Sequence, residues 1–357
     1  MKNPLVSFSI VSYNQEAYIR EAVAGALSQT YSPLEVIISD DCSKDRTFEI
    51  VQEMVAAYKG PHAIRLNRNP TNLGIAENCN RALALCRGEL LIGAAGDDIS
   101  VAERASITVR AWNDSGCRST SLACRFEVID ENGRLLEGDP DFVLQEAAVR
   151  WVHERGTVAG FLRRRQPHVS GCVHSIARKL ITELGPLSPT VIYEDTALCF
   201  RTVLAGGYFT FIDAPLVKYR RHGQNLTFAL HQARPQNVAA YKDFCAKRVI
   251  ELDRFVEVYK GFAADAEVAM RQGLVSQVAY PALRKQILFE GRRFELKREL
   301  LLQPWLLRPV VFWRLFSNTL RPREMLEYLP FLLPRKWHCW LLVSRNKIQG
   351  KKSGSDL

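Results

Sequence analysis

The sequence predicts an α/β fold in which a doubly wound sheet is followed by a helical C-terminal region. Four strand-like segments alternate with three helix-like segments in the first 98 residues, which is typical of parallel strands with helices on both faces. Aspartate pairs follow two of those strands, at Asp40-Asp41 and at Asp97-Asp98. The last fifth of the chain has helical spacing and combines basic residues with large apolar ones.

The N-terminal part is organised as alternating strands and helices. Its predicted strands are short, apolar and rich in β-branched residues, whereas its predicted helices carry apolar residues at helical spacing. Asn14 is expected to cap the first helix and Gly60 to end the second. We expect strands at 5–14, 34–41, 63–69 and 89–98, and helices at 16–29, 45–60 and 74–88.

The pattern changes after Asp98, where the sheet is expected to become mixed. An alternating stretch with Glu131-Asn132-Gly133 near its centre predicts a β-hairpin, and the chain is helical from about Pro235 onward. Between them we expect a helix at 142–156, a strand leading into a helix at 168–185, a helix at 191–207 and a pair of strands at 208–223. The predicted domains are 1–230, in two halves at 1–100 and 101–230, and a helical appendage at 231–357.

Composition limits the class of protein. The 357 residues are 47% hydrophobic and 24% charged, which indicates a globular chain with a sizeable core. The nine cysteines show no CxxC spacing, which argues against a disulfide framework or a zinc site and favours a reducing compartment. The first residues lack the long apolar core and cleavage site of a secretory signal, so we expect a cytoplasmic location.

The C-terminal region is basic and aromatic. From Glu290 to the end there are 14 Lys and Arg against 6 Asp and Glu, which supplies +8 of the formal net charge of +10. Basic residues interrupt each apolar run before about 18 residues, so no membrane span is expected. This mixture over 290–350 favours a helix lying on an anionic membrane surface, and an ordinary helical subdomain with a solvated basic face is the alternative. No nucleic-acid-binding motif is present, and nucleic acid is not an expected partner.

Polar residues at the predicted strand ends indicate a ligand site. In doubly wound sheets ligands bind at the carboxyl ends of the strands, which here carry Tyr13-Asn14, Asp40-Asp41, Asn67-Arg68 and Asp97-Asp98. Asp98, with Asp97, can supply hard oxygen ligands to Mn²⁺ or Mg²⁺, and Asp40 or Asp41 can accept hydrogen bonds from a base or ribose. One aspartate pair could be a helix cap or a solvated turn, but two pairs at one edge favour a metal and a polyphosphate. No G-x-G-x-x-G or G-x-x-x-x-G-K-[ST] motif is present, which argues against a dinucleotide oxidoreductase and a P-loop enzyme.

Five motifs follow one another along the chain: SIVSYNQEAYIREAVAGALSQTY, LEVIISDDCSKDRT, NPTNLGIAENCNRAL, GELLIGAAGDD and YEDTALCFR. In this order they resemble the family 2 glycosyltransferases, over roughly residues 5–225. The resemblance implies a GT-A-type doubly wound mixed sheet with the helical, basic-aromatic region as an appendage. It also implies inverting transfer of a sugar from a nucleoside diphosphate sugar, with 1–100 as the nucleotide-binding half and 101–230 as the acceptor-binding half.

The resemblance implies a nucleotide site and a metal site. Asp41 matches the position that contacts the base, with Asp40 beside it. The family's Asp-x-Asp element falls on Ala95-Gly96-Asp97, so its first acidic position is absent here, and the expected metal ligands are Asp97 and Asp98. The other nucleotide-binding residues implied are Ser12, Tyr13, Asn14, Glu16, Asn72 and Asn80.

The resemblance also implies one catalytic carboxylate. Inverting transfer needs a base that deprotonates the acceptor hydroxyl, and Asp195 matches the family's position for it. At the start of a helix the dipole favours the ionised form of Asp195, although a simple helix cap is the alternative. Glu194 beside it would orient the acceptor, and His222 matches a histidine near the metal and the diphosphate. Weaker candidates for acceptor or phosphate contacts are His174, Arg220 and Arg221.

The partners of the reaction are only partly defined. The chain lacks the Q-x-x-R-W motif of processive synthases in its family position, which favours addition of a single sugar. We expect a UDP-sugar donor and a glycan or lipid-linked acceptor in cell-surface polysaccharide or lipopolysaccharide synthesis, at the cytoplasmic face of the inner membrane. The alternatives are a soluble or protein acceptor and an inactive nucleotide-sugar-binding scaffold, which only Ala95 favours. The sequence does not fix the sugar, the linkage or the oligomeric state, and a homo-oligomer is compatible with it.

Overall fold

The chain forms two compact units, Met1–His222 with Gly261–Pro281 and Gly223–Lys260 with Ala282–Leu357. The computed structural model describes residues 3–137, 154–155, 157–162, 169–225, 238–304, 306–318 and 332.

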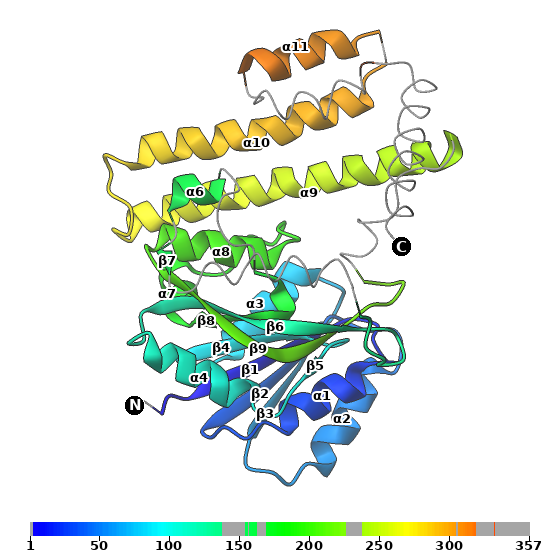
Figure 1. Ribbon diagram of the computed structural model, residues 1–357, viewed down its shortest axis with the longest axis vertical. Coiled ribbons are helices and arrows are strands. Elements are labelled where there is room, and N and C mark those ends of the chain that lie inside the picture. Colours follow the sequence, from blue (N-terminus) through cyan, green and yellow to red (C-terminus); the bar gives the residue numbers. More distant parts are fainter. Residues whose placement is uncertain are drawn as a thin grey trace, which may run out of the picture. The chain divides into compact units, whose positions relative to one another are not determined.

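The first unit is built around one mixed sheet (Figure 1). Its strands run in the order β3-β2-β1-β4-β8-β6-β9-β5, and β7 pairs with β9. Strands β1 to β4 form the parallel half, as predicted, and β8 joins β4 in the antiparallel direction. The predicted α/β fold with a mixed sheet is therefore confirmed. The strands are β1 Val6–Ser12, β2 Leu34–Asp40, β3 Ala63–Arg68, β4 Leu90–Ala95, β5 Ile99–Ser100, β6 Ser119–Ile129, β7 Glu154–Arg155, β8 His174–Ala177 and β9 Tyr208–Arg220.

Strand β1 alternates apolar residues with serine and is buried on both faces. Val6, Phe8 and Ile10 are 0% exposed, and Ser7 and Ser9 on the opposite face are also buried. A buried hydroxyl needs a hydrogen-bond partner, and Ser7 Oγ donates to Glu35 Oε1 at 2.6 Å. The small serine side chains leave room on their face of the sheet, where Ser9 lines a cavity.

Helices α1 to α3 alternate with the parallel strands, whereas α4 packs against β9 and β6. The first helix begins later than predicted. Asn14 does not cap it, because α1 begins at Ile19. Asn14 instead has a φ of 51°, and its Oδ1 accepts a hydrogen bond from Lys44 N at 2.8 Å. The second helix ends at Ala57, before Gly60. The bounds are α1 Ile19–Leu27, α2 Thr47–Ala57, α3 Ile75–Leu85 and α4 Arg104–Asp114.

In the second half of the sheet, one long strand replaces the predicted pair at 208–223. Strand β9 runs parallel to β6, and its register shifts between Ile212 and Pro215. Such a bulge absorbs extra residues while the strand continues in the same direction. The predicted hairpin is present in a short form, because Ile129 pairs antiparallel with Leu135. The helix predicted at 142–156 lies outside the described residues except at 154–155, which are strand.

Helix α8, Glu194–Leu204, carries the predicted catalytic residue and is fixed by a buried arginine. Arg201 is 0% exposed and forms two hydrogen bonds with Asp265, at 2.9 and 2.7 Å. Its Nη1 donates to the carbonyl oxygen of Gly185, and its Nη2 also donates to that of Pro186. A buried guanidinium whose nitrogens are all hydrogen-bonded holds one position, so it fixes α8 against Asp265 and the Gly185-Pro186 segment. The shorter helices of this unit are α6 Val158–Leu162, η2 Gly171–Val173 and α7 Lys179–Leu184.

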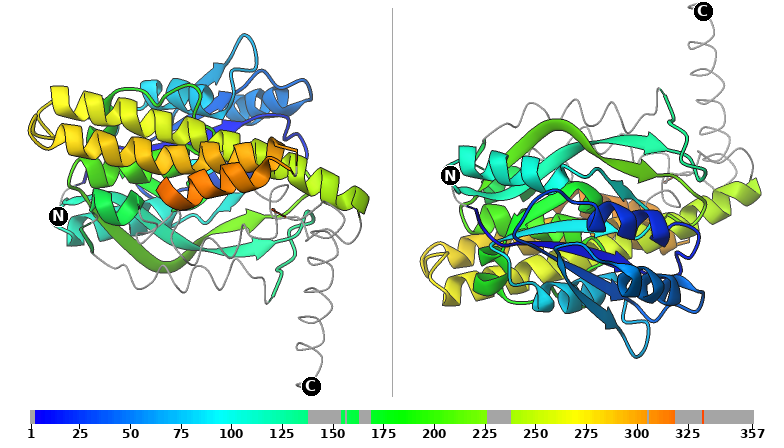
Figure 2. Two further views of the ribbon diagram at one scale, coloured as in Figure 1. Left: turned by 90° about the horizontal axis from the view of Figure 1, so that it is seen from above. Right: turned by 90° about the horizontal axis from the view of Figure 1, so that it is seen from below.

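The described part of the second unit is helical, as predicted. Helices α9 and α10 lie side by side (Figure 2), and their contacts show that they run antiparallel. Phe255 stacks on Phe294 with ring centroids 4.9 Å apart, and Asp253 pairs with Arg298 further along. The helices are α9 Val238–Arg271, whose last residues from Gly261 belong to the first unit, α10 Tyr280–Leu302 and α11 Arg308–Asn318.

Candidate active site

The loops that follow β1 and β2 are bonded to each other and form one rim of the site. Asn14 N donates to Ser43 Oγ at 2.9 Å, and Glu16 N donates to Asp45 Oδ2 at 3.1 Å. In return, backbone amides of the β2–α2 loop donate to the Asn14 and Glu16 side chains at 2.8 and 2.9 Å. Tyr13 is 43% exposed at the end of β1. Asn14 and Glu16, both predicted to bind the nucleotide, thus hold the two loops together, and the Tyr13 ring is exposed to solvent.

Asp40 is 0% exposed and is bonded within its own turn. Ser43 donates to both of its oxygens, from the amide at 2.8 Å and from the hydroxyl. Ser12 Oγ lies 3.5 Å from Oδ1, and Arg68 Nε lies 3.8 Å from Oδ2. Asp40 and Ser12 are therefore buried side chains that stabilise the loop between β2 and α2.

Asp41 is 3% exposed and binds the loop that precedes α3. Its Oδ1 accepts hydrogen bonds from Asn69 Nδ2 and Leu73 N, both at 2.8 Å, and its Oδ2 accepts one from Gly74 N at 2.9 Å. Oδ1 already accepts two hydrogen bonds, so only Oδ2 can accept a further one, and a nucleotide contact by Asp41 stays a prediction. The adjacent charges of Asp40 and Asp41 are tolerated because they have separate donors.

The asparagines of the third motif differ in their surroundings. Asn72 is exposed, as a ligand contact requires. Asn80 bonds both sides of the Leu187 peptide, donating to its carbonyl at 2.9 Å and accepting from its amide at 2.8 Å. It therefore fastens α3 to the segment before α8. Asn78, which the sequence did not single out, accepts from Ser39 Oγ at 2.6 Å and bridges β1 and β2 through their carbonyls.

Asp97 and His222 lie together, although they are 125 positions apart in the sequence. Asp97 Oδ2 and His222 Nε2 are 3.0 Å apart, and the side chains are 13% and 6% exposed. The His222 ring lies against the Tyr18 ring, with centroids 4.6 Å apart. A carboxylate oxygen and an imidazole nitrogen are both ligands that Mn²⁺ accepts. Of the predicted metal ligands, these two are suitably placed.

Asp98, predicted as the main metal ligand, faces the protein interior. Its Oδ1 accepts a hydrogen bond from Arg220 N at 2.8 Å. Burial, followed by the charge of Asp97, raises the pKa of Asp98 well above its usual value, and burial lowers the pKa of the nearby Arg104. Within the ranges the structure describes, no group of three His, Cys, Asp or Glu side chains is placed to hold a metal ion. A metal held by this chain would need further ligands from substrate or water.

Arg220 is bonded to protein groups around the Asp97–His222 pair. It is 1% exposed, and its Nε donates to the Asp97 carbonyl at 3.0 Å. Its Nη1 donates to the Glu131 carbonyl at 3.2 Å, and its Nη2 pairs with Glu21. The guanidinium also lies 5.0 Å from the Tyr18 ring centroid. A phosphate contact, as predicted for Arg220, would require it to leave these partners.

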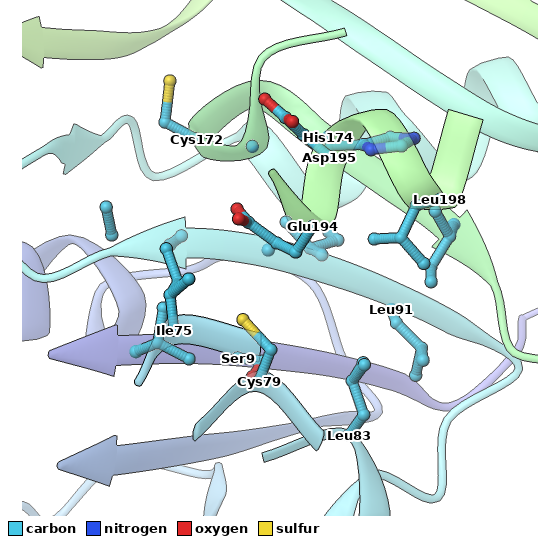
Figure 3. A pocket seen from close by; sticks show the side chains of 17 residues that line it. Ser9, Ile75, Cys79, Leu83, Leu91, Cys172, His174, Glu194, Asp195 and Leu198 are labelled. Carbon is cyan, nitrogen blue, oxygen red and sulfur yellow. The ribbon is translucent and has the colours of Figure 1, made fainter. Parts of the chain in front are cut away.

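The acidic pair at the start of α8 borders a cavity of about 130 Å³ between the sheet and helices α3 and α8. Figure 3 shows the Glu194 carboxylate projecting into the cavity on the side of Ile75, and Asp195 also lines the cavity. Asp195 Oδ1 accepts hydrogen bonds from Thr196 N at 2.5 Å and from Thr196 Oγ1 at 3.2 Å. The predicted catalytic residue therefore lies at a cavity, where a substrate group can reach it.

Glu194 carries the clearest electrostatic perturbation of this cavity. Burial, followed by the charge of Asp195, raises the pKa of Glu194 to about 8. Gly171 makes space for this carboxyl group, because a Cβ at that position would lie 2.6 Å from Glu194 Oε1. The Glu194 carboxyl group is thus protonated at neutral pH beside Asp195.

His174 and Arg221, the remaining weak candidates, differ in accessibility. His174 is 4% exposed, lines the cavity, and its Nε2 lies 2.6 Å from Ser121 Oγ. Arg221 is partly exposed, and its amide donates to the Ile129 carbonyl at 2.8 Å. Of the adjacent arginines at the end of β9, Arg221 is the more accessible to an anionic ligand.

Comparison with known proteins gives a family and a fold. Residues 7–177 match the family model of glycosyl transferase family 2. An uncharacterised protein of Mycobacterium tuberculosis is 45% identical over 94 residues, which are 26% of this chain and 27% of that protein. The chondroitin synthase of Escherichia coli is 35% identical over 136 residues, which are 37% of this chain and 19% of that protein. The chain therefore matches little more than a quarter of the first relative and less of the second.

Among solved structures, TarS 1–349 of S. aureus in complex with UDP-GlcNAc has a similar fold. The TM-score is 0.53 at 15% sequence identity, over 92% of this chain and 90% of that chain.

Proposed function

We propose that the protein transfers one sugar from a nucleoside diphosphate sugar to a glycan or lipid-linked acceptor, with inversion. The match of residues 7–177 to the model of glycosyl transferase family 2 and the similarity of the fold to TarS support this proposal. The observation that carries the proposal is the position of Asp195 at a cavity on the same unit as the Asp97–His222 pair. These are the parts that such a transfer needs: a base and a site for the diphosphate.

Asp195 is the proposed general base. It takes the proton of the acceptor hydroxyl as that oxygen attacks the anomeric carbon, and the nucleoside diphosphate leaves from the opposite face. It lies in the first turn of α8, where the helix dipole interacts favourably with a negatively charged group. The buried Arg201–Asp265 pair holds α8 in place, which keeps the base aligned with the donor.

Asp97 and His222 are the proposed protein ligands of a Mn²⁺ or Mg²⁺ ion. Their ligand atoms are 3.0 Å apart and come from the ends of two strands, and the oxygen and nitrogen donors fit such a cation. A bound cation would neutralise the charge of the leaving diphosphate. The proposal assigns Asp98 to positioning, since its carboxylate holds the Arg220 amide.

UDP is the proposed nucleotide, because the solved protein of similar fold binds UDP-GlcNAc and the family habit favours UDP. The exposed Tyr13 ring and Asn72 are the proposed contacts for the uridine, together with Asp41.

An anionic membrane surface is the proposed location of the acceptor. Within the described part of the second unit, four large apolar side chains at the start of α11 are more than half exposed, and basic residues surround them in the sequence. No helix in the described ranges is long and apolar enough to cross a bilayer. Apolar side chains among basic ones can bind at a membrane surface, which supports the proposal of a lipid-linked acceptor in cell-surface polysaccharide or lipopolysaccharide synthesis. The four residues are Leu306, Leu307, Val310 and Trp313.

Nucleotide-dependent thermal stabilisation tests the proposal directly. We expect UDP with Mn²⁺ to raise the melting temperature of the full chain, and EDTA or Asp97→Ala to reduce the shift, because a ligand that binds only the folded state stabilises it by mass action. In a transfer assay, Asp195→Asn should keep the UDP shift and lose at least about a hundredfold in rate. A folded protein that no nucleoside diphosphate stabilises would contradict the proposed function.

A further inference from the structure

We propose that the cavity beside Asp195 binds the acetamido group of an N-acetylated amino sugar, and that Glu194 recognises its amide. This inference rests on the proposed function and adds the class of sugar to it.

The size of the cavity comes from small residues on two elements. Gly93, Ala94 and Ala95 line it from β4, and Gly171 lines it from the η2 turn. A Cβ at Gly93 would lie 3.3 Å from the His174 carbonyl oxygen, and one at Gly171 would collide with Glu194. The resulting volume of about 130 Å³ is close to that of an apolar cavity that admits benzene, about 150 Å³. It is large enough for an acetamido group and one edge of a pyranose ring.

The walls of the cavity are mainly apolar. The side chains of Ile75, Cys79 and Leu83 line it from α3, and Leu91 and Leu198 line it from the sheet and from α8. Such walls favour a methyl group over a hydroxyl group, because a hydroxyl group that moves from water to an apolar wall loses its hydrogen bonds. At C2 a plain hexose has a hydroxyl group, whereas an N-acetylated sugar has an acetamido group that ends in a methyl group.

The polar groups of the cavity exclude an acidic substituent. Its lining residues, all of them within the described ranges, include Glu194 and Asp195 but no lysine or arginine. A uronate carboxylate at this place would meet acidic side chains without a counter-charge, which is unfavourable away from bulk water.

Glu194 supplies the polar complement of an amide. Because burial and the Asp195 charge raise the pKa of Glu194 to about 8, its carboxyl group holds a proton at neutral pH. A protonated carboxyl group has one O–H donor and one carbonyl acceptor, and an amide has one acceptor and one N–H donor. The two groups can therefore exchange two hydrogen bonds, with the methyl group directed toward Ile75 and Cys79.

A pairwise binding comparison in the full chain tests this inference. Affinities for UDP-GlcNAc and UDP-GalNAc are measured by calorimetry against those for UDP-Glc and UDP-Gal, with Mn²⁺ present. Each pair differs only at C2, so the ratio within a pair isolates the acetamido group. We expect the N-acetylated member of at least one pair to bind about tenfold or more tightly.

Three variants show whether the cavity and Glu194 account for that ratio. Cys79→Leu fills the cavity and should bring the ratio close to one, whereas Cys245→Leu in the second unit makes the same change elsewhere and should keep the wild-type ratio. Glu194→Gln retains a donor and an acceptor and should keep most of the preference, which Glu194→Ala should lose. Because each ratio is taken within one variant, a general loss of affinity cancels.

The outcomes separate this inference from the proposed function. If UDP binds and the sugars of each pair bind equally, the acetamido inference is wrong and the transferase proposal stands. A preference that survives Cys79→Leu would also overturn it. If neither UDP nor any UDP-sugar binds, the proposed donor itself is wrong.

Discussion

The titration of Glu194 should make the stability of the protein depend on pH. Burial and the charge of Asp195 raise its pKa from 4.5 to about 8 in the folded chain. An acid with a higher pKa in the folded state holds more protons there than in the unfolded state between these two values. Stability therefore falls as the pH rises from about 4.5 to about 8, and the loss is complete above the folded pKa. Glu194→Gln removes this titration while keeping the shape of the side chain.

The size of the effect follows from the interval between the two pKa values. At about 1.36 kcal/mol per pH unit, the full interval corresponds to a loss of ~5 kcal/mol in the free energy of unfolding. Glu194 is partly accessible to solvent by surface area, and solvent screening weakens such interactions, so we expect about 1–3 kcal/mol. In a domain of this size about 1 kcal/mol shifts the melting temperature by roughly 2–4 °C. E194Q should therefore melt roughly 2–12 °C above the wild type at pH 9, as these figures imply.

Thermal unfolding of the two proteins between pH 4 and pH 9 measures the difference. The curves should converge near pH 4, where Glu194 is protonated in both the folded and the unfolded state. Glu103→Gln, at an exposed glutamate before α4, controls for the loss of one acidic side chain and should follow the wild type. A constant offset between E194Q and wild type at every pH would refute the reasoning.

Two further predictions concern the metal pair and the membrane surface. Arg220→Lys and Arg201→Lys each remove a buried guanidinium, and both should lower the free energy of unfolding, by up to about 3–5 kcal/mol, and with it the melting temperature. Only R220K should weaken Mn²⁺ binding, about tenfold, because Arg220 holds the backbone of Asp97 whereas Arg201 bonds elsewhere. Calorimetry with Mn²⁺ measures this, and equal Mn²⁺ affinities in the two variants would show that Arg220 has only a structural role. Trp313→Ala should reduce sedimentation with anionic vesicles several-fold, while Leu288→Ala, at an exposed leucine of α10, should not. If both variants sediment as the wild type does, the α11 face is not the membrane contact.

The first 98 residues allowed a good prediction of the fold because local pattern and topology agree there. Strands β1 to β4 are short apolar runs with helical segments between them, and they form the parallel half of the sheet. Strand β9 was less predictable. The Asp213-Ala214-Pro215 segment has the composition of a turn, but the structure accommodates it in a bulge against β6. That outcome depends on a neighbouring strand about 90 positions away, which local sequence does not encode.

The candidate site was harder to predict, because the function of a polar side chain depends on its partners. Arg220 and Arg221 are adjacent and of the same residue type, yet Arg220 is buried among carbonyl groups and Arg221 is partly exposed. Asn78 and Asn80 share the same helix, and each bonds backbone groups far along the chain. Tyr18 contacts both His222 and Arg220, but no sequence pattern marks it as part of the site. In each case the partner is brought near by the tertiary fold.

The two aspartate pairs illustrate how like charges are accommodated at a strand end. In the first pair, Asp40 binds its own turn and Asp41 binds the loop before α3, so each carboxylate has its own donors. In the second pair, Asp98 takes the inward position and accepts the Arg220 amide, and Asp97 faces His222. A cation at this edge would therefore meet Asp97 first, because the inward oxygens of Asp98 help to hold the end of β9 in place. The absence of an acidic residue at Ala95 fits this arrangement, since that position lines the cavity beside Glu194, where a further carboxylate would oppose the ionised form of Asp195.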